Sequence, residues 1–275
     1  LEIAHLDNAF VSEEITTYFP KDGCKLHVLA YDITEEHHRE FQKLRENVFD
    51  LVPYLRGQGI VHVLAHPLFA VNERLTPDHF EQALLLFNTL ELNGTRDEMQ
   101  NSALRTIVDN LTPEKIDQLA NKHDLEPYGE TPWVKGLTGG SDDHSGINIA
   151  RVYTEVVDVE TPQDMLKAVS EGRAMVQGKA ATPHTMAHNL YGIVECCRYI
   201  DNVLDPGDKE NPSILDKLQS FIYRQRSKKY FKTSDSVQAA LLREANRIVE
   251  SDDRARNISC GFRYSPEELE DEWFR

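Results

Sequence analysis

The sequence is poor in positive charge and has no long apolar run. Its 275 residues include 30 Lys and Arg against 46 Asp and Glu, which gives a formal net charge of -16 at pH 7. Surfaces that bind nucleic-acid backbones are basic, so this balance argues against that class of partner. The apolar stretches are all shorter than a bilayer crossing requires, and we expect no membrane span.

Cysteine is scarce as well. The four cysteines are Cys24, Cys196, Cys197 and Cys260, with one adjacent pair and no Cys-x-x-Cys spacing. This pattern argues against a disulfide framework and predicts free thiols, as is typical of a reducing cytoplasm. The sequence also lacks the Gly-x-Ser-x-Gly element that presents a nucleophilic serine in many hydrolases.

Strand-like and helix-like patterns alternate up to about residue 178, which is typical of a parallel α/β architecture. The strands are predicted at residues 25–32, 60–65, 89–92, 152–157 and 174–176. Helix starts are predicted at Thr34, Thr76, Thr112 and Thr161, the last three followed by proline. Apolar residues recur at helical spacing after Thr34, and they predict one long helix that ends near Gly57.

Beyond about residue 182 the strand patterns give way to helical ones. We therefore predict an α/β domain at residues 1–181 and a helical extension at 182–275, with helices near 182–203, 212–226 and 234–250. An apolar stripe on the second of these helices needs a partner surface. That partner is either the domain's own helices, a second copy of the chain, or a further domain.

Residues 141–144 read Ser-Asp-Asp-His and follow two glycines. If a strand ends there, Asp142 and His144 leave it on the same side, because side chains two residues apart share a face. A carboxylate and an imidazole placed in this way are a metal-ligand arrangement. A polar turn with an Asp-rich cap is the alternative interpretation.

A second candidate is His66, which ends the apolar run Val-Leu-Ala and precedes Pro67. Proline disfavours the helical conformation at the residue before it, so we expect His66 to be extended at the carboxyl end of a buried strand. Parallel α/β folds place their chemistry at that end. A hydrogen-bonded core histidine is the alternative.

Three further segments carry polar residues near predicted strands. Glu14 lies in Glu-Glu-Ile-Thr-Thr, and His27 lies in Lys-Leu-His-Val-Leu. Glu91 and Asn93 lie in Leu-Glu-Leu-Asn-Gly, which is an apolar strand with a carboxylate near its end. Each residue taken singly is explained by a structural role, and their order along the chain makes the stronger case.

Taken in that order, these segments resemble the PHP family, named for polymerase and histidinol phosphatase domains, over about residues 1–190. The resemblance implies a distorted, TIM-like β/α barrel that binds two or three divalent metal ions, and many family members hydrolyse phosphoesters. By resemblance, Glu14 matches the second-motif glutamate, His66 the third-motif histidine, and Asp142 with His144 the last motif. His27 matches a histidine of the branch that hydrolyses small nucleotides.

The chain also departs from the family pattern. PHP proteins open with a His-x-His pair and carry a later Thr-Asp-His-like segment, and neither is found here. The chain starts at Leu1 without an initiator methionine or a secretory or transit pattern. We therefore expect that the natural N-terminus, with the first strand and motif, lies upstream.

These residues predict a metal-dependent phosphoesterase acting on a small phosphorylated or nucleotide-like substrate through a hydroxide activated by Mn, Fe or Zn. The predicted catalytic residues are Glu14, His66, Asp142 and His144. The predicted metal ligands are Glu14, His27, His66, Glu91, Asp142 and His144. Lys135 and Asn93 are predicted to bind substrate, Lys135 as a point charge on a phosphate, with an exposed strand lysine as the alternative.

A degenerate PHP domain that acts as a scaffold or regulatory module is the second hypothesis, and the missing first motif favours it. Such a domain would be fused or bound to a glycosyltransferase-like partner, since that arrangement is found with this kind of PHP segment. The helical extension would provide the contact, or would mediate a homo-oligomer. Under either hypothesis the chain is expected to be cytoplasmic.

Overall fold

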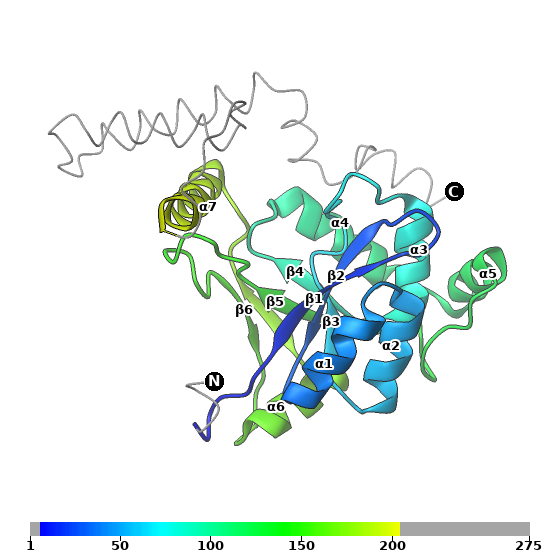
Figure 1. Cartoon of the computed structure of the whole chain (residues 1–275). Helices are drawn as coiled ribbons and strands as arrows, with labels where there is room; N and C mark the ends of the chain where they lie inside the picture. Colours follow the sequence, from blue (N-terminus) through cyan, green and yellow to red (C-terminus); the bar gives the residue numbers. More distant parts are fainter. Residues whose placement is uncertain (1–5, 204–275) are drawn as a thin grey trace, which may run out of the picture. The chain divides into compact units, whose positions relative to one another are not determined.

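A computed structural model describes residues 6–203, with side chains as far as residue 194 (Figure 1). The helices predicted near 212–226 and 234–250 lie outside the described residues. The chain divides into two compact units. The first contains the residues up to Ser141 together with Ala150–Ala180, and the second contains Asp142–Ile149 and the helix that follows Ala181.

The first unit is built on a five-stranded sheet. Its strands are β1 (Glu13–Tyr18), β2 (Lys25–Ala30), β3 (His62–Leu64), β4 (Thr89–Asn93) and β5 (Gly136–Gly140), hydrogen-bonded in that order. The β1–β2 and β2–β3 pairs are antiparallel, whereas the β3–β4 and β4–β5 pairs are parallel. All strands except β2 therefore run in one direction, and the predicted α/β class is confirmed.

The predicted closure of the strands into a barrel is not found among the described residues. The five strands follow one another in an open order, and β6 (Val152–Glu155) pairs with β7 (Met175–Gly178) in a separate antiparallel sheet. Contact between β5 and β6 is made through a side chain, because the Thr154 hydroxyl donates to Gly139 O and accepts from Gly139 N. The Thr154 hydroxyl therefore bonds the backbone of β5 where backbone groups of a sixth strand would do so if the sheet continued.

Helices follow the strands as the alternating pattern predicts. They are α1 (Glu35–Leu44), α2 (Val48–Gly57), α3 (Pro77–Leu86), α4 (Glu98–Asp109), α5 (Pro113–His123), α6 (Pro162–Ser170) and α7 (Pro183–Val203). All four predicted threonine caps occupy N-cap positions. A threonine followed by proline favours the start of a helix. The threonine hydroxyl accepts a hydrogen bond from a first-turn amide that has no other partner, and proline at the first helical position has no amide hydrogen that would need one.

The long helix predicted from Thr34 to Gly57 is two helices instead. Asn47 lies between α1 and α2 in an extended conformation, and its side chain accepts from the Phe49 amide and so starts a new helix. The apolar spacing continues across the break, which is why periodicity alone predicted a single element.

Helix α4 was not predicted, although its signals are present in the sequence. Asp97 caps it by accepting from the Gln100 amide. Its buried side chains Leu104, Ile107 and Val108 have the three- and four-residue spacing of a helix face. The residues of α4 before Leu104 are mostly polar, so the apolar spacing that indicates a helix covers only its second half.

The core lies between the sheet and the helices, and β4 is at its centre. Every residue of β4 is buried. Phe41, Leu51, Phe80 and Leu84 of the surrounding helices are fully buried against the sheet side chains. Each such side chain contributes on the order of 1.5–3 kcal/mol by leaving water. None of the helices in residues 6–203 is both long enough and apolar enough to span a membrane.

Gly140 at the end of β5 makes room for a side chain of β4. A Cβ atom at this position would lie 2.0 Å from Glu91 Oε1. We expect Gly140→Ala to lower the free energy of unfolding by about 1–3 kcal/mol, because the buried carboxylate has to be displaced. Urea titration measures the change. Gly57→Ala is the matched control, since nothing lies within 4 Å of its Cβ, and an equal loss there would contradict the explanation.

Candidate metal centre

The register between β1 and β2 places Glu14 beside His27. Thr16 is the direct partner of His27 across the antiparallel pair, and Glu14 lies two residues before Thr16. Side chains two residues apart share one face of a strand, so Glu14 and His27 are diagonal neighbours on the same face. Ile15 and Thr17 point the other way and are buried.

His66 reaches the same place from the end of β3. The Ala65 amide donates to His27 O, which continues the β2–β3 ladder by one residue, and the chain then turns at His66. The prediction of an extended His66 is wrong, because its φ is 30°, in the left-handed region. The proline rule is a local preference, and contacts made from other strands override it here.

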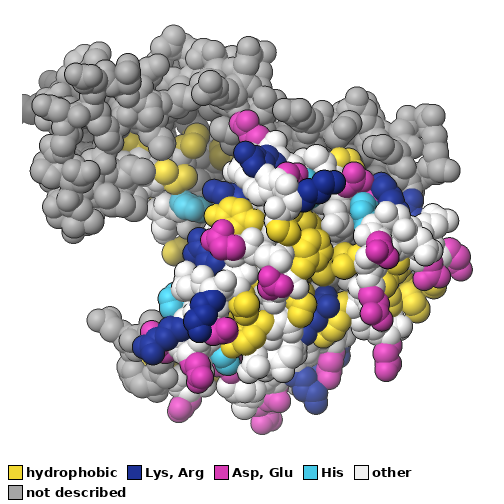
Figure 2. Space-filling view, turned by 45° about the vertical axis from the view of Figure 1, so that its right-hand side comes forward, with side chains coloured by type: hydrophobic (Ala, Val, Ile, Leu, Met, Phe, Trp, Pro, Cys, Tyr) yellow, Lys and Arg dark blue, Asp and Glu magenta, His cyan; other side chains and the backbone are white. Residues whose placement is uncertain are grey.

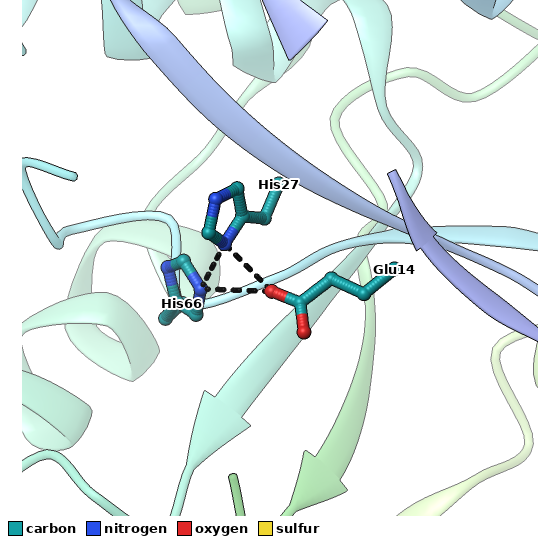
Figure 3. Close-up of side chains that lie close together, drawn as sticks. All are labelled: Glu14, His27 and His66. Atoms are coloured by element: carbon teal, nitrogen blue, oxygen red, sulfur yellow. Dashed lines mark hydrogen bonds and ion pairs between the residues drawn. The ribbon is translucent and has the colours of Figure 1, made fainter. Parts of the chain in front are cut away.

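Three side chains converge at this point from three segments of the chain (Figure 3). His27 Nδ1 lies 2.6 Å from Glu14 Oε1 and 3.1 Å from His66 Nε2. His66 Nε2 lies 3.5 Å from the same Glu14 oxygen. The His66 side chain is 6% exposed and that of Glu14 is 44% exposed, so the group has a buried wall and an open side.

The electrostatics of the group favour an ionised carboxylate. Hydrogen bonds from His27 and then from His66 hold the pKa of Glu14 well below its usual range, although partial burial opposes them. An anionic oxygen faced by two imidazole nitrogens is a donor set suited to a divalent transition metal ion. One ligand atom from each of the three residues lies within 4.8 Å of the others, so these residues can hold a metal ion.

Asp142 and His144 belong to the second unit, and there the structure brings them close to each other. His144 Nδ1 lies 3.0 Å from the Asp142 carbonyl oxygen and 3.7 Å from Asp142 Oδ1. Asp142 has a left-handed φ of 45°, and the His144 amide donates to Oδ1 of Asn189, a buried residue of α7. The sequence analysis missed the part that Asn189 plays in this loop.

Glu91 is not a member of the three-residue group. Its Oε2 accepts from the His66 amide at 2.9 Å and from Asn93 Nδ2 at 3.0 Å. The Asn93 side-chain oxygen accepts from the amide and the hydroxyl of Thr95. Glu91, predicted as a metal ligand, and Asn93, predicted to bind substrate, therefore both lie in a buried hydrogen-bond network that includes the His66 amide.

Lys135 is buried, and backbone carbonyl groups accept hydrogen bonds from its ammonium. Its ammonium is buried and donates to Leu84 O at 2.7 Å and to Phe87 O at 2.8 Å, which caps the carboxyl end of α3. It precedes the first residue of β5, whereas the Ser-Asp-Asp-His segment follows the last one. The five residues of β5, roughly 16 Å of strand, separate these positions.

A second group with metal-ligand chemistry lies between α3 and α5. It consists of Asp78, Glu81 and His123. The Lys122 ammonium lies 2.9 Å from Asp78 Oδ1 and 2.7 Å from Glu81 Oε2. It already provides a positive charge for both carboxylates. We interpret this group as a salt-bridge network that joins two helices. On the face drawn in Figure 2, Asp and Glu side chains are likewise interspersed with Lys and Arg.

Comparison with models of known protein families gives no match to this chain. Comparison with curated proteins gives none either. The resemblance to the PHP family therefore depends on the residues and motifs described above.

The buried position of Lys135 predicts a pH dependence of stability. Burial lowers the pKa of Lys135 to about 7, whereas the pKa of a lysine in the unfolded chain is 10.5. Between these values the unfolded chain binds more protons, so the free energy of unfolding rises with pH. We expect a rise of about 2 kcal/mol from pH 7 to pH 9 relative to Lys135→Met. Urea titrations at the two pH values measure it, and parallel changes in both proteins would contradict this assignment.

Proposed function

We propose that the chain is a metal-dependent phosphoesterase with Glu14, His27 and His66 among its metal ligands. The observation that carries the proposal is the convergence of one carboxylate oxygen and two imidazole nitrogens from three separate segments. Each of these residues was predicted as a ligand before any geometry was considered. A chance surface cluster would not be expected to select the same three residues.

The residues have properties suited to this role. Glu14 keeps its negative charge because the two histidines favour the ionised form. His66 is fixed by burial and by hydrogen bonds on both sides of its peptide unit. Glu14 lies on the exposed side of the group, and by resemblance it would hold metal ions there.

Divalent Mn, Fe or Zn ions bound here would neutralise phosphate oxygens and lower the pKa of water toward neutrality. Glu14, His27 and His66 would hold these ions, and by resemblance Asp142 and His144 would bind metal as well. A small phosphorylated or nucleotide-like substrate suits a protein with a net charge of -16, since bound cations supply the local positive charge. The proposal includes two or three ions per chain and a hydrolytic reaction.

Metal content and hydrolysis test this proposal directly. In protein purified without chelator or a metal-binding tag, we expect two or three Mn, Fe or Zn ions per chain by elemental analysis. Asp142→Ala should lose both the metal and the hydrolysis of p-nitrophenyl phosphate without unfolding. His66→Ala should lower metal affinity by at least about tenfold, because it removes a buried ligand.

His123→Ala is the matched control, since it removes an equally buried histidine from the salt-bridge network of α3 and α5. It should keep the metal content of the unchanged protein. Hydrolysis retained in Asp142→Ala would overturn the assignment of the site. Absence of bound metal from the unchanged protein would favour the scaffold hypothesis.

A further inference from the structure

His66 has a backbone conformation that residues with a side chain rarely adopt. Its φ of 30° lies outside the extended and right-handed helical regions, and Pro67 follows it. Such a conformation persists only where the surrounding structure determines it, and it is concentrated at functional sites. Contacts around His66 must therefore hold this conformation in place.

Hydrogen bonds on both sides of the residue fix this conformation. The carbonyl oxygen of His66 accepts from the Phe69 amide at 2.9 Å, which is a local turn. The amide of His66 donates to Glu91 Oε2, also at 2.9 Å, from a strand residue 25 positions away. The second bond connects the end of β3 to the neighbouring, fully buried strand β4.

The neighbours of Glu91 keep its carboxylate in place. The residue is 5% exposed, and its Oε2 also accepts from Asn93 Nδ2. The side chain of Asn101 exchanges two hydrogen bonds with the backbone of Asn93. Oε1 lies toward Gly140, where a Cβ atom would come within 2.0 Å. Burial of a carboxylate destabilises the fold unless the carboxylate accepts hydrogen bonds. The His66 amide is one of the donors that Glu91 has.

We propose that Glu91 is a positioning residue for the metal centre. By accepting from the His66 amide it holds the left-handed backbone that turns the imidazole toward β1 and β2. Nε2 of His66 then lies 3.1 Å from His27 Nδ1 and 3.5 Å from Glu14 Oε1. The inference rests on the proposed function for the statement that these three residues bind metal. It adds a fourth residue that acts without contacting the ion.

The role assigned to Glu91 requires an acceptor atom at this position and does not require a negative charge. Glu91→Gln keeps an oxygen that can accept from the His66 and Asn93 amides. Glu91→Met keeps the length of the side chain and removes the acceptor. Positioning therefore predicts that glutamine preserves the centre and that methionine disrupts it, whereas a long-range charge effect predicts that both variants lose it equally.

Titration of the chelator-treated protein with Co²⁺, followed by visible absorption, tests this difference. We expect Glu91→Met to bind Co²⁺ about ten- to a hundredfold more weakly, with an altered spectrum, because supporting residues of this kind orient metal ligands. Glu91→Gln should stay within about threefold of the unchanged protein on the same argument. Equal weakening in both variants would overturn the proposal, as would unchanged binding in a folded Glu91→Met.

Glu81→Met is the matched control. Glu81 is another buried carboxylate, on α3, and its partners Lys122 and His123 are on α5, so its loss should leave Co²⁺ binding unchanged. Weakening as large as that of Glu91→Met would show that general loosening of the fold is responsible.

Hydrogen exchange of the His66 amide in the metal-free protein provides a test independent of metal. We expect slow exchange in the unchanged protein and in Glu91→Gln, and fast exchange in Glu91→Met. Slow exchange without Co²⁺ binding would refute the proposed function and keep the hydrogen bond that positions His66. Fast exchange in the folded, unchanged protein would overturn the positioning role, whatever the metal affinity. If Glu91→Met does not fold, His66 amide exchange in the unchanged protein still decides, since fast exchange there overturns the positioning role and slow exchange supports it.

Discussion

The burial of β4 is the constraint on which the rest of the first unit depends. All five residues from Thr89 to Asn93 are buried between two parallel neighbours. A carboxylate placed on such a strand must find its hydrogen-bond donors inside the protein. Glu91 finds them in the His66 amide and the Asn93 side chain, and Gly140 on β5 leaves the space that the carboxylate fills. The turn that carries His66 is in this way anchored to the buried strand β4.

Elements with local signals were predictable from the sequence. The threonine caps of α1, α3, α5 and α6 determine where these helices begin, and each signal acts within one turn. The break at Asn47 was missed because the apolar spacing continues across it. The open sheet was not predictable, since strand order depends on contacts between distant segments. The meeting of β5 and β6 through the Thr154 hydroxyl has no pattern in the sequence.

The candidate site shows the same division. The residue types at positions 14, 27 and 66 indicated metal chemistry, but their proximity depends on the β1–β2 register and on the turn after β3. Glu91 was assigned by its closeness to the end of a strand, and Lys135 because it precedes the Ser-Asp-Asp-His segment. Neither argument shows what a side chain contacts, and the Lys135 ammonium is buried against backbone carbonyl groups. The conformation of His66 was mispredicted because its cause lies 25 residues away.

The short connection between β1 and β2 determines whether Glu14 and His27 lie on the same face of the sheet. Phe19 and Cys24 close it by a backbone hydrogen bond, and the Gly23 amide returns to Phe19 O, so the length of the turn sets which residues face each other. Insertion or deletion of one residue there, with the β2 pairing retained, would direct Ile15 toward His27 and Glu14 toward the core, since strand side chains alternate. A relative with such a change would keep Glu14, His27 and His66 in its sequence without bringing their side chains together. The length of this loop therefore decides whether the three residues meet, as much as their identities do.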